Sequence, residues 1–533
     1  MSTRHYLKPN VVFEPLINNW YANEMLLSPA HFALFLVNHH IQVMESFVDA
    51  PEMHLEAAQD GSLMGAPFMN QPLDVLPDVE KIIAENKAQL AECFGFAEGY
   101  QQFYELLLEQ ADGFSIEPFY DKLPEALRGY VELVYDVNNK PLVRFFEGLL
   151  YNSPYYKPEL QSFGVYEITS DERSSIRSTP RLKNDYQFGF SMPFKERALD
   201  ELYKMRIEGG DLAAVKQKLG ITDAQFDTFF TTEAPAHVGR RFSGEGVRVR
   251  YYGHACILIE TNEVSLLVDP LISYDVGAEP ERLTLQDLPE KIDYVLLTHS
   301  HSDHTVFETL LQIRHKVGQV VVPKGNSGYI ADPSLKLILQ HLGFDDVRDL
   351  DDMEEVVLPN GRVVSLPFLG EHSDLNVRSK NTFCIELKDR KILVIVDSKN
   401  LDPVLNQHLH AHLGDMDMIF MSMLFDVGPL SWAYGALLPV TISRKMDRSR
   451  LSSSNNYDEA LKVIEQFNPK YVYFYAMGYE PWLSHILDIK HQDDSEQISD
   501  AGKMVAECER RDIHSKILYA KDEFVMEPVV EMA

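Results

Sequence analysis

The sequence is poor in cysteine and in long apolar runs, two features that define other protein classes. Only four cysteines occur in 533 residues and none forms a CxxC pair, so neither a disulfide framework nor a thiolate zinc site is indicated. No uninterrupted apolar run reaches the roughly 18 residues of a membrane-spanning helix, and the first residues lack the apolar core of a secretion signal. We therefore expect a cytoplasmic protein that does not enter the membrane.

Basic residues are also scarce. The chain has 49 Lys and Arg against 81 Asp and Glu, which gives a formal net charge of -32. Proteins that bind nucleic acid need Lys and Arg to neutralise phosphates, so no nucleic-acid partner is expected. The same acidity gives no simple attraction to an acidic protein partner, although a local basic segment could supply one.

The length predicts two or more domains, because one hydrophobic core rarely serves 533 residues. Residues 1–235 show mostly helical periodicity, and residues 232–246 are rich in turn formers. From residue 247 to 533 strands alternate with helices, which indicates a layered α/β domain. Within the first part we expect one strand and four amphipathic helices. The strand is placed at 164–169 and the helices at 78–93, 97–110, 125–137 and 212–218.

Four potential metal ligands follow a predicted strand that ends near Leu297. They are His299, His301, Asp303 and His304. Side chains alternate along a strand with period two, so His299 and His301 point the same way and can reach one ion. Apolar residues after them recur at helical spacing, so we expect Asp303 and His304 at the start of a helix, where they can serve a second ion. A dinuclear metal centre is predicted.

Further candidate ligands follow three other predicted strands, since site residues in layered folds gather on the loops at strand ends. The candidates are Glu371 or His372, then Asp397, then Glu480 or His485. A single carboxylate such as Asp397 is well suited to bridge two ions. The adjacent His39 and His40 lie in an apolar helical segment and are expected to be structural.

The candidate ligands and their order along the chain resemble those of the metallo-β-lactamase superfamily, and the resemblance covers residues 247–490. The HxHxDH motif carries this resemblance, together with Gly253-His254 and Val268-Asp269-Pro270 in the opening strands. The resemblance implies an αββα sandwich and, commonly, zinc-dependent hydrolysis by a bridging hydroxide. His254 and Asp269 are then expected to support the ligands from behind or to be structural.

One departure from that pattern concerns the ligand after Gly370. Hydrolases of the superfamily usually place a histidine directly after the glycine, whereas here Glu371 follows Gly370 and His372 is displaced by one. A carboxylate makes the site harder and more anionic, which suits iron better than zinc. With the long helical N-terminal region, this pattern resembles the diiron β-hydroxylases of non-ribosomal peptide pathways over nearly the whole chain.

This closer resemblance implies a ligand set and a reaction. One iron would be bound by His299, His301 and Glu371, the other by Asp303, His304 and His485, with Asp397 bridging. The reaction would use O2 and an external electron donor to hydroxylate the β-carbon of an aminoacyl group held as a thioester on a peptidyl carrier protein. In this family the N-terminal domain contributes to dimerisation and substrate access, so a homodimer is expected.

Two other functions remain open at this point. A dinuclear zinc hydrolase, acting as a thioesterase, lactonase or phosphodiesterase, would use the same ligands with His372 in place of Glu371. A non-catalytic assembly protein would keep only the fold. A basic segment is a candidate docking surface for an acidic carrier protein, with a solvated loop as the equal alternative. Its residues are Arg444, Lys445, Arg448 and Arg450.

Overall fold

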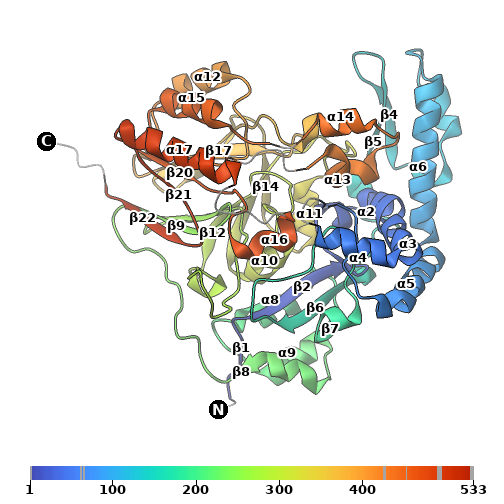
Figure 1. Ribbon diagram of the computed structural model, residues 1–533, viewed down its shortest axis with the longest axis horizontal. Helices are drawn as coiled ribbons and strands as arrows, with labels where there is room; N and C mark the ends of the chain where they lie inside the picture. Colours follow the sequence, from blue (N-terminus) through green and yellow to red (C-terminus); the bar gives the residue numbers. More distant parts are fainter. Residues whose placement is uncertain are drawn as a thin grey trace.

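The computed structural model describes residues 3–528, except for 61–62, 64–65, 424–427, 452 and 489–494. Figure 1 shows two sheets with the N-terminal helices on one side, in blue and cyan, and helices in orange and red on the other. None of the helices in the described residues is long and apolar enough to cross a membrane.

The C-terminal part consists of two seven-stranded sheets. The first has the order β14-β13-β12-β11-β10-β9-β22, and the second β15-β16-β17-β18-β19-β20-β21. The strands of the first sheet are β9 (Val247–Gly253), β10 (Cys256–Glu260), β11 (Ser265–Val268), β12 (Ile292–Leu296), β13 (Val317–Pro323), β14 (Val347–Leu350) and β22 (Asp522–Met526). Those of the second are β15 (Glu355–Leu358), β16 (Gly361–Pro367), β17 (Asn381–Leu387), β18 (Arg390–Val396), β19 (Met418–Met421), β20 (Tyr471–Phe474) and β21 (His514–Ile517).

Both faces of the central strands of each sheet are buried, which explains their nearly continuous apolar sequences. Alternate residues such as Ile257 and Leu266 face Phe383 and Val394 across the space between the sheets. The other face of the first sheet is covered by α10 (Phe307–Ile313) and α11 (Leu335–His341). The other face of the second is covered by α12 (Pro403–Leu413), α15 (Tyr457–Phe467) and α17 (Glu496–Arg510). This is the αββα sandwich predicted from the resemblance.

The N-terminal part is a mixture of helices and small sheets, as expected for an α+β region. Its helices are α1 (Glu24–Leu27), α2 (Pro29–Phe35), α3 (Ile41–Asp49), α4 (Pro51–Gln59), α5 (Leu76–Gln89), α6 (Ala91–Gln110), α7 (Glu147–Leu150), α8 (Ala198–Lys204) and α9 (Leu212–Leu219). An antiparallel sheet has the order β3-β2-β6-β7, formed by β2 (Val11–Ile17), β3 (Trp20–Tyr21), β6 (Gln161–Glu167) and β7 (Phe188–Ser191). A further strand pair joins β1 (Tyr6–Leu7) to β8 (Phe230–Thr231).

The helix expected at 125–137 is not formed. A short 3-10 turn at Glu125–Leu127 is followed by β4 (Val131–Tyr135), which pairs with β5 (Pro141–Phe145) in a hairpin. Asn139 at the hairpin tip has a φ of 58°, a conformation that Asn tolerates better than most residues. The β-branched and aromatic residues of β4 favour a strand, and the turn allows it to pair.

The N-terminal and C-terminal parts share one hydrophobic core. Phe13 on β2 and Leu310 on α10 belong to the same buried cluster, as does Leu258 on the first sheet. Between β2 and α10 the buried Arg173 donates to Glu14 at 3.0 Å and to Glu308 at 2.7 Å. Because a buried charge is tolerated only when it is paired, this network fixes the N-terminal part against the sandwich. The predicted division at 235–247 lies in the segment between β8 and β9.

Candidate metal centre

The predicted motif lies in the turn after β12, at the edge where the carboxyl ends of β11, β12 and β13 meet. Asp303 and His304 are not on a helix, contrary to expectation. His304 N–H and Thr305 N–H both donate to the carbonyl of His301, at 3.0 and 2.9 Å, and α10 begins only at Phe307. This tight turn folds the four motif side chains back toward the sheets.

A first group of ligand atoms is formed by His299, His301 and Glu371. His299 Nε2 lies 3.2 Å from His301 Nδ1, and His301 Nδ1 lies 3.3 Å from Glu371 Oε1. The three ligand atoms all lie within 4.8 Å of one another. Two imidazole nitrogens and one carboxylate oxygen that converge in this way form a typical transition-metal site.

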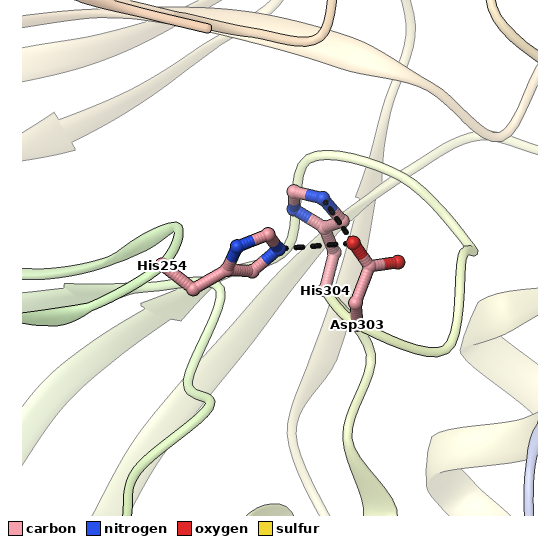
Figure 2. Close-up of side chains that lie close together, drawn as sticks. All are labelled: His254, Asp303 and His304. Carbon is pink, nitrogen blue, oxygen red and sulfur yellow. Dashed lines mark hydrogen bonds and ion pairs between the residues drawn. The ribbon is translucent and has the colours of Figure 1, made fainter. Parts of the chain in front are cut away.

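A second group is formed by His254, Asp303 and His304, which Figure 2 shows turned toward one another. Asp303 Oδ2 lies 2.9 Å from His254 Nε2 and 3.3 Å from His304 Nε2. His254 comes from the turn between β9 and β10, where it follows Gly253. From the sequence, His254 was expected to support the ligands from behind or to be structural, whereas its Nε2 lies in the second group.

Asp397, at the end of β18, lies between the two groups. Its Oδ2 is 3.1 Å from His304 Nε2 and 3.8 Å from His299 Nε2. Its other oxygen accepts a hydrogen bond of 2.7 Å from the Ser422 hydroxyl, which fixes the carboxylate. With His299 and His304 it forms a third group of ligand atoms, which joins the other two.

The ring of His304 is fixed from behind by Asp269. His304 Nδ1 lies 2.9 Å from Asp269 Oδ2, and Asp269 Oδ1 also accepts the N–H of Thr298 at 2.8 Å. With Nδ1 donating, the lone pair of Nε2 points at the carboxylates of Asp303 and Asp397. This buried Nε2 has no hydrogen-bond partner among the described residues. Two carboxylates that converge on a ring nitrogen without a well-formed hydrogen bond fit a bound cation.

Burial and neighbouring charges set the protonation that metal binding needs. Burial and the adjacent His304 and His301 hold the pKa of His299 well below its ordinary value, so the ring is neutral. Burial alone would raise the pKa of Asp303, but His304 and His254 hold it well below its usual range. Burial alone would lower the pKa of His304, but the carboxylates of Asp303, Asp269 and Asp397 hold it well above its ordinary value, so a metal ion at its Nε2 would have to displace a proton.

The loop that carries Glu371 has a strained backbone. Glu371, His372, Ser373 and Asp374 have φ values of 56°, 50°, 51° and 56° in succession. Left-handed residues other than glycine cost roughly 1–2 kcal/mol each. The loop is held by Arg450, whose Nε donates to the carbonyl of Ser373 at 2.8 Å. Strain of this kind persists where the surrounding structure forces it, and it often marks functional sites.

The structure brings Glu371, and not His372, to the ligand atoms. His372 Nδ1 shares a hydrogen bond of 2.5 Å with the hydroxyl of Tyr434 on α13 (Leu430–Tyr434). Its ring lies against that of His301, with centroids 4.2 Å apart, but it belongs to none of the three groups of ligand atoms.

Neither residue expected to provide the last ligand lies in a ligand group. Glu480 accepts a hydrogen bond from the Tyr251 hydroxyl. His485 lies on α16 (Ser484–Leu487), after a turn at Pro481–Leu483 that carries the chain away from the end of β20. Burial and two nearby arginines, Arg173 and Arg181, hold the pKa of His485 well below its ordinary value. In the described residues His485 therefore lies outside the groups of ligand atoms, whereas His254 lies in one of them.

The turn that presents His254 was noted in the sequence as part of the resemblance, but not as the source of a ligand. Gly253 has a φ of 105°, and a Cβ added there would lie 2.5 Å from Cζ2 of Trp482. Only glycine fits this position. A Gly-His pair between two strands is therefore a visible signal, but the distance from His254 to Asp303 is set by the packing of the turn and not by spacing.

A cavity of about 70 Å³ opens beside His301. It lies between the N-terminal part and α13, and its walls are largely aromatic. The lining side chains include Trp20, Glu24, Phe35, His40, Trp432 and Tyr434. The cavity is small and has both aromatic and polar walls, and it gives the His301 side of the ligand groups an approach from the N-terminal part.

Comparison with protein families gives two matches that together cover both parts of the chain. A model described as the diiron non-heme beta-hydroxylase N-terminal domain matches residues 6–235. A beta-lactamase superfamily domain model matches residues 248–371.

Sequence comparison with individual proteins agrees with these family matches. A protein from Streptomyces venezuelae, the 3-hydroxylase of 4-amino-L-phenylalanyl groups on the CmlP peptidyl carrier protein, is 34% identical over 516 residues, 94% of this chain and 96% of that protein. A UPF0173 metal-dependent hydrolase from Geobacillus is 32% identical over 97 residues, but these are 18% of this chain and 40% of that protein.

The similarity extends to the three-dimensional structure. The crystal structure of CmlA, a diiron beta-hydroxylase from Streptomyces venezuelae, matches with a TM-score of 0.91 and 31% identity over 99% of this chain and 100% of that chain. Because the hydroxylase matches nearly the whole chain and the hydrolase only a short part, the comparisons favour the hydroxylase interpretation over the zinc hydrolase. The chain belongs to the family of non-haem diiron β-hydroxylases.

Proposed function

We propose that this protein is a monooxygenase that hydroxylates the β-carbon of an aminoacyl group tethered as a thioester to a peptidyl carrier protein. The observation that carries the proposal is the pair of adjacent groups of ligand atoms. One group includes Glu371, and Asp397 lies between the two. Family membership supports it, since the relative from Streptomyces venezuelae is named for this reaction on a carrier-bound amino acid.

We assign seven residues to two iron ions. His299, His301 and Glu371 would hold one, His254, Asp303 and His304 the other, and Asp397 would bridge them. His254 replaces His485 in the set expected from the sequence. The donors are four imidazole nitrogens and three carboxylates with no thiolate, a set that suits iron in both oxidation states.

The two irons, when bound, supply the capacity to reduce O2 with electrons from an external donor. The balance is simple: one oxygen atom enters the Cβ–H bond, and the other leaves as water with two protons and two donor electrons. The chain's own residues position the reactants. Asp269 holds the Nδ1 side of His304 so that Nε2 faces the other carboxylates, Ser422 fixes Asp397, and His372 with Tyr434 ties the Glu371 loop to α13.

Burial of the centre protects the reaction from water. The side chains of His299 and His304 are 0% exposed, and that of His301 is 20% exposed, on the side of the aromatic cavity. A reactive centre that is open on one side only is expected to exclude competing water while admitting a tethered group.

We further propose that the basic segment docks the carrier protein. Three of its four basic residues lie on a short exposed helix, α14 (Arg444–Arg448). Asp447 of this helix accepts the N–H and the hydroxyl of Ser431 on α13, at 2.8 and 2.9 Å. Since α13 lines the aromatic cavity, a carrier protein on α14 would deliver its arm close to the cavity. Cations at this place would attract an acidic carrier protein despite the negative total charge.

A homodimer is also proposed. The hairpin and the end of α6 expose large apolar side chains, with Phe114 80% and Val137 98% exposed. Exposed apolar residues grouped on one projection often mark a protein interface. Gel filtration of the protein at micromolar concentration tests this: elution as a monomer would remove the proposal.

We also propose that the protein is located in the cytoplasm. The four cysteines, Cys93, Cys256, Cys384 and Cys508, are all free and buried. Free thiols fit a reducing compartment.

The reaction is tested with a carrier protein loaded with a 4-aminophenylalanyl group. The iron-loaded protein, O2 and a reductant are expected to add one oxygen atom to the thioester, seen by mass spectrometry, and 18O2 is expected to label it. Release of the free acid without added oxygen would instead support a thioesterase.

A further inference from the structure

The aromatic cavity has one acidic group in its wall. Glu24, the first residue of α1, is 4% exposed and lines the cavity together with His301 and Ser302. Its Oε2 accepts a long hydrogen bond of 3.5 Å from the Ser302 hydroxyl. Ser302 lies between the proposed ligands His301 and Asp303, so this carboxylate borders the metal centre without belonging to a group of ligand atoms.

Glu24 lacks the cationic partners that the buried Glu14 has. Glu14, which is 1% exposed, is paired with Arg173 and Arg181 at 3.0 and 2.9 Å. Among the ion pairs of the described residues none includes Glu24, and the half-buried Arg177 of the same cavity is not within ion-pair distance. Because the cavity opens at this carboxylate, a positively charged ligand in the cavity would supply the partner that the protein does not.

The cavity walls favour the same kind of ligand. Trp20 and His40 stack face to face with ring centroids 3.9 Å apart, and Trp432 and Tyr434 complete the aromatic lining. His39 and His40 belong to a π-helical turn, Leu36–His40, a distortion often found at functional sites. Aromatic faces attract cations, most strongly ammonium groups that have lost water.

We infer that Glu24 binds the α-ammonium group of the aminoacyl substrate and thereby turns the β-carbon toward the metal centre. This inference rests on the proposed function. The α-ammonium is attached to the carbon next to the one that reacts, so holding it beside Ser302 places the β-carbon on the His301 side. The amine is largely protonated near neutral pH, whereas an aryl amine on the side chain is uncharged and gains less from a carboxylate.

Binding is measured first, without turnover. The probe is an S-(4-aminophenylalanyl) pantetheine thioester, compared with its analogue that lacks the α-amine, and the signal is the fluorescence of Trp20 and Trp432 in the iron-loaded protein without reductant or O2. The wild type is expected to bind the aminoacyl probe about 10- to 100-fold more tightly than the analogue, the usual range for a charged hydrogen bond. In Glu24→Gln this preference should fall to about one, with the affinity for the analogue unchanged.

Two further variants control for structural effects. Glu24→Asp keeps the charge and should retain part of the preference. Asp488→Asn changes a buried carboxyl outside this cavity, which accepts from Ser175 at 2.9 Å, and should retain all of it. A Glu24→Gln protein that still prefers the aminoacyl probe overturns the inference, as does a wild type without preference. Preferential binding without hydroxylation would instead overturn the proposed function and leave the role of Glu24 standing.

Discussion

His304 Nδ1 lies 2.9 Å from Asp269 Oδ2, and both side chains are fully buried. This contact fixes which ring nitrogen of His304 carries the proton, so that Nε2 is left to face Asp303 and Asp397. The centre therefore depends on a residue that is not a ligand.

Asp269→Asn should weaken metal binding. The amide cannot accept both from Thr298 and from His304, so the ring loses its fixed tautomer. Loss of such a supporting carboxylate typically lowers metal affinity about 10- to 100-fold. Iron retained after dialysis against a chelator measures the effect. Glu480→Gln, a buried carboxylate bonded to Tyr251, is the control and should keep its iron. Equal retention in both variants would show that Asp269 is only structural.

His254→Ala and His485→Ala form a matched pair, because both histidines are buried and only one lies in a ligand group. We expect about one iron per chain in His254→Ala. His485→Ala should keep two and lose stability through the cavity that it creates. Metal analysis gives the number of irons per chain, and thermal unfolding gives the stability. Two irons in His254→Ala and one in His485→Ala would show that His485 is the ligand.

Glu371→Gln should change which metal the centre prefers. Its carboxylate is the anionic member of the first group, and a neutral amide is a much weaker ligand for ferric iron. With iron and zinc offered in equal amounts, the wild type should take mainly iron, whereas the variant should take less iron and relatively more zinc. An unchanged metal ratio would mean that Glu371 does not coordinate.

Arg444→Ala, Lys445→Ala and Arg448→Ala combined should weaken carrier-protein binding about 10-fold or more, with a smaller dependence on salt. Arg450→Ala is a separate comparison, because Arg450 holds the carbonyl of Ser373 in the Glu371 loop. It should alter activity more than carrier affinity. A titration in which the triple variant binds as the wild type does would exclude α14 as the docking surface.

Glu147 gives a pH-dependent contribution to stability. Burial raises its pKa from 4.5 to about 7, although it accepts the N–H groups of Gly328 and Ser334. A raised carboxyl pKa means that its contribution is present at low pH and is lost as the pH rises through about 7. Relative to Glu147→Gln, the wild type should lose about 3 kcal/mol between pH 4.5 and 8, measured by denaturant unfolding. A constant difference would contradict the shifted pKa.

Local patterns in the sequence predicted much of this protein. The turn after β12 could be assigned a metal site because the spacing of His299, His301, Asp303 and His304 is itself the signal. The strands β9, β10 and β11 lie where alternating and continuous apolar runs predicted them. Glu371 was singled out because it stands where a histidine is usual.

Other features could not be predicted from the sequence, because they depend on contacts between residues far apart in the chain. The position of His254 next to Asp303 follows from a glycine turn seated against Trp482, which no local pattern encodes. The left-handed run at 371–374 is held by Arg450, far away in sequence. The segment 125–137 has helical periodicity, but hairpin pairing prevails over that preference.

The central claim is that the two groups of ligands hold a pair of irons. Metal analysis of protein prepared without air and with iron available, combined with its optical spectrum, tests this most directly. The account predicts about two irons per chain and a visible absorption that bleaches on reduction. Two zinc ions in a colourless protein that gains no activity on iron reconstitution would contradict it.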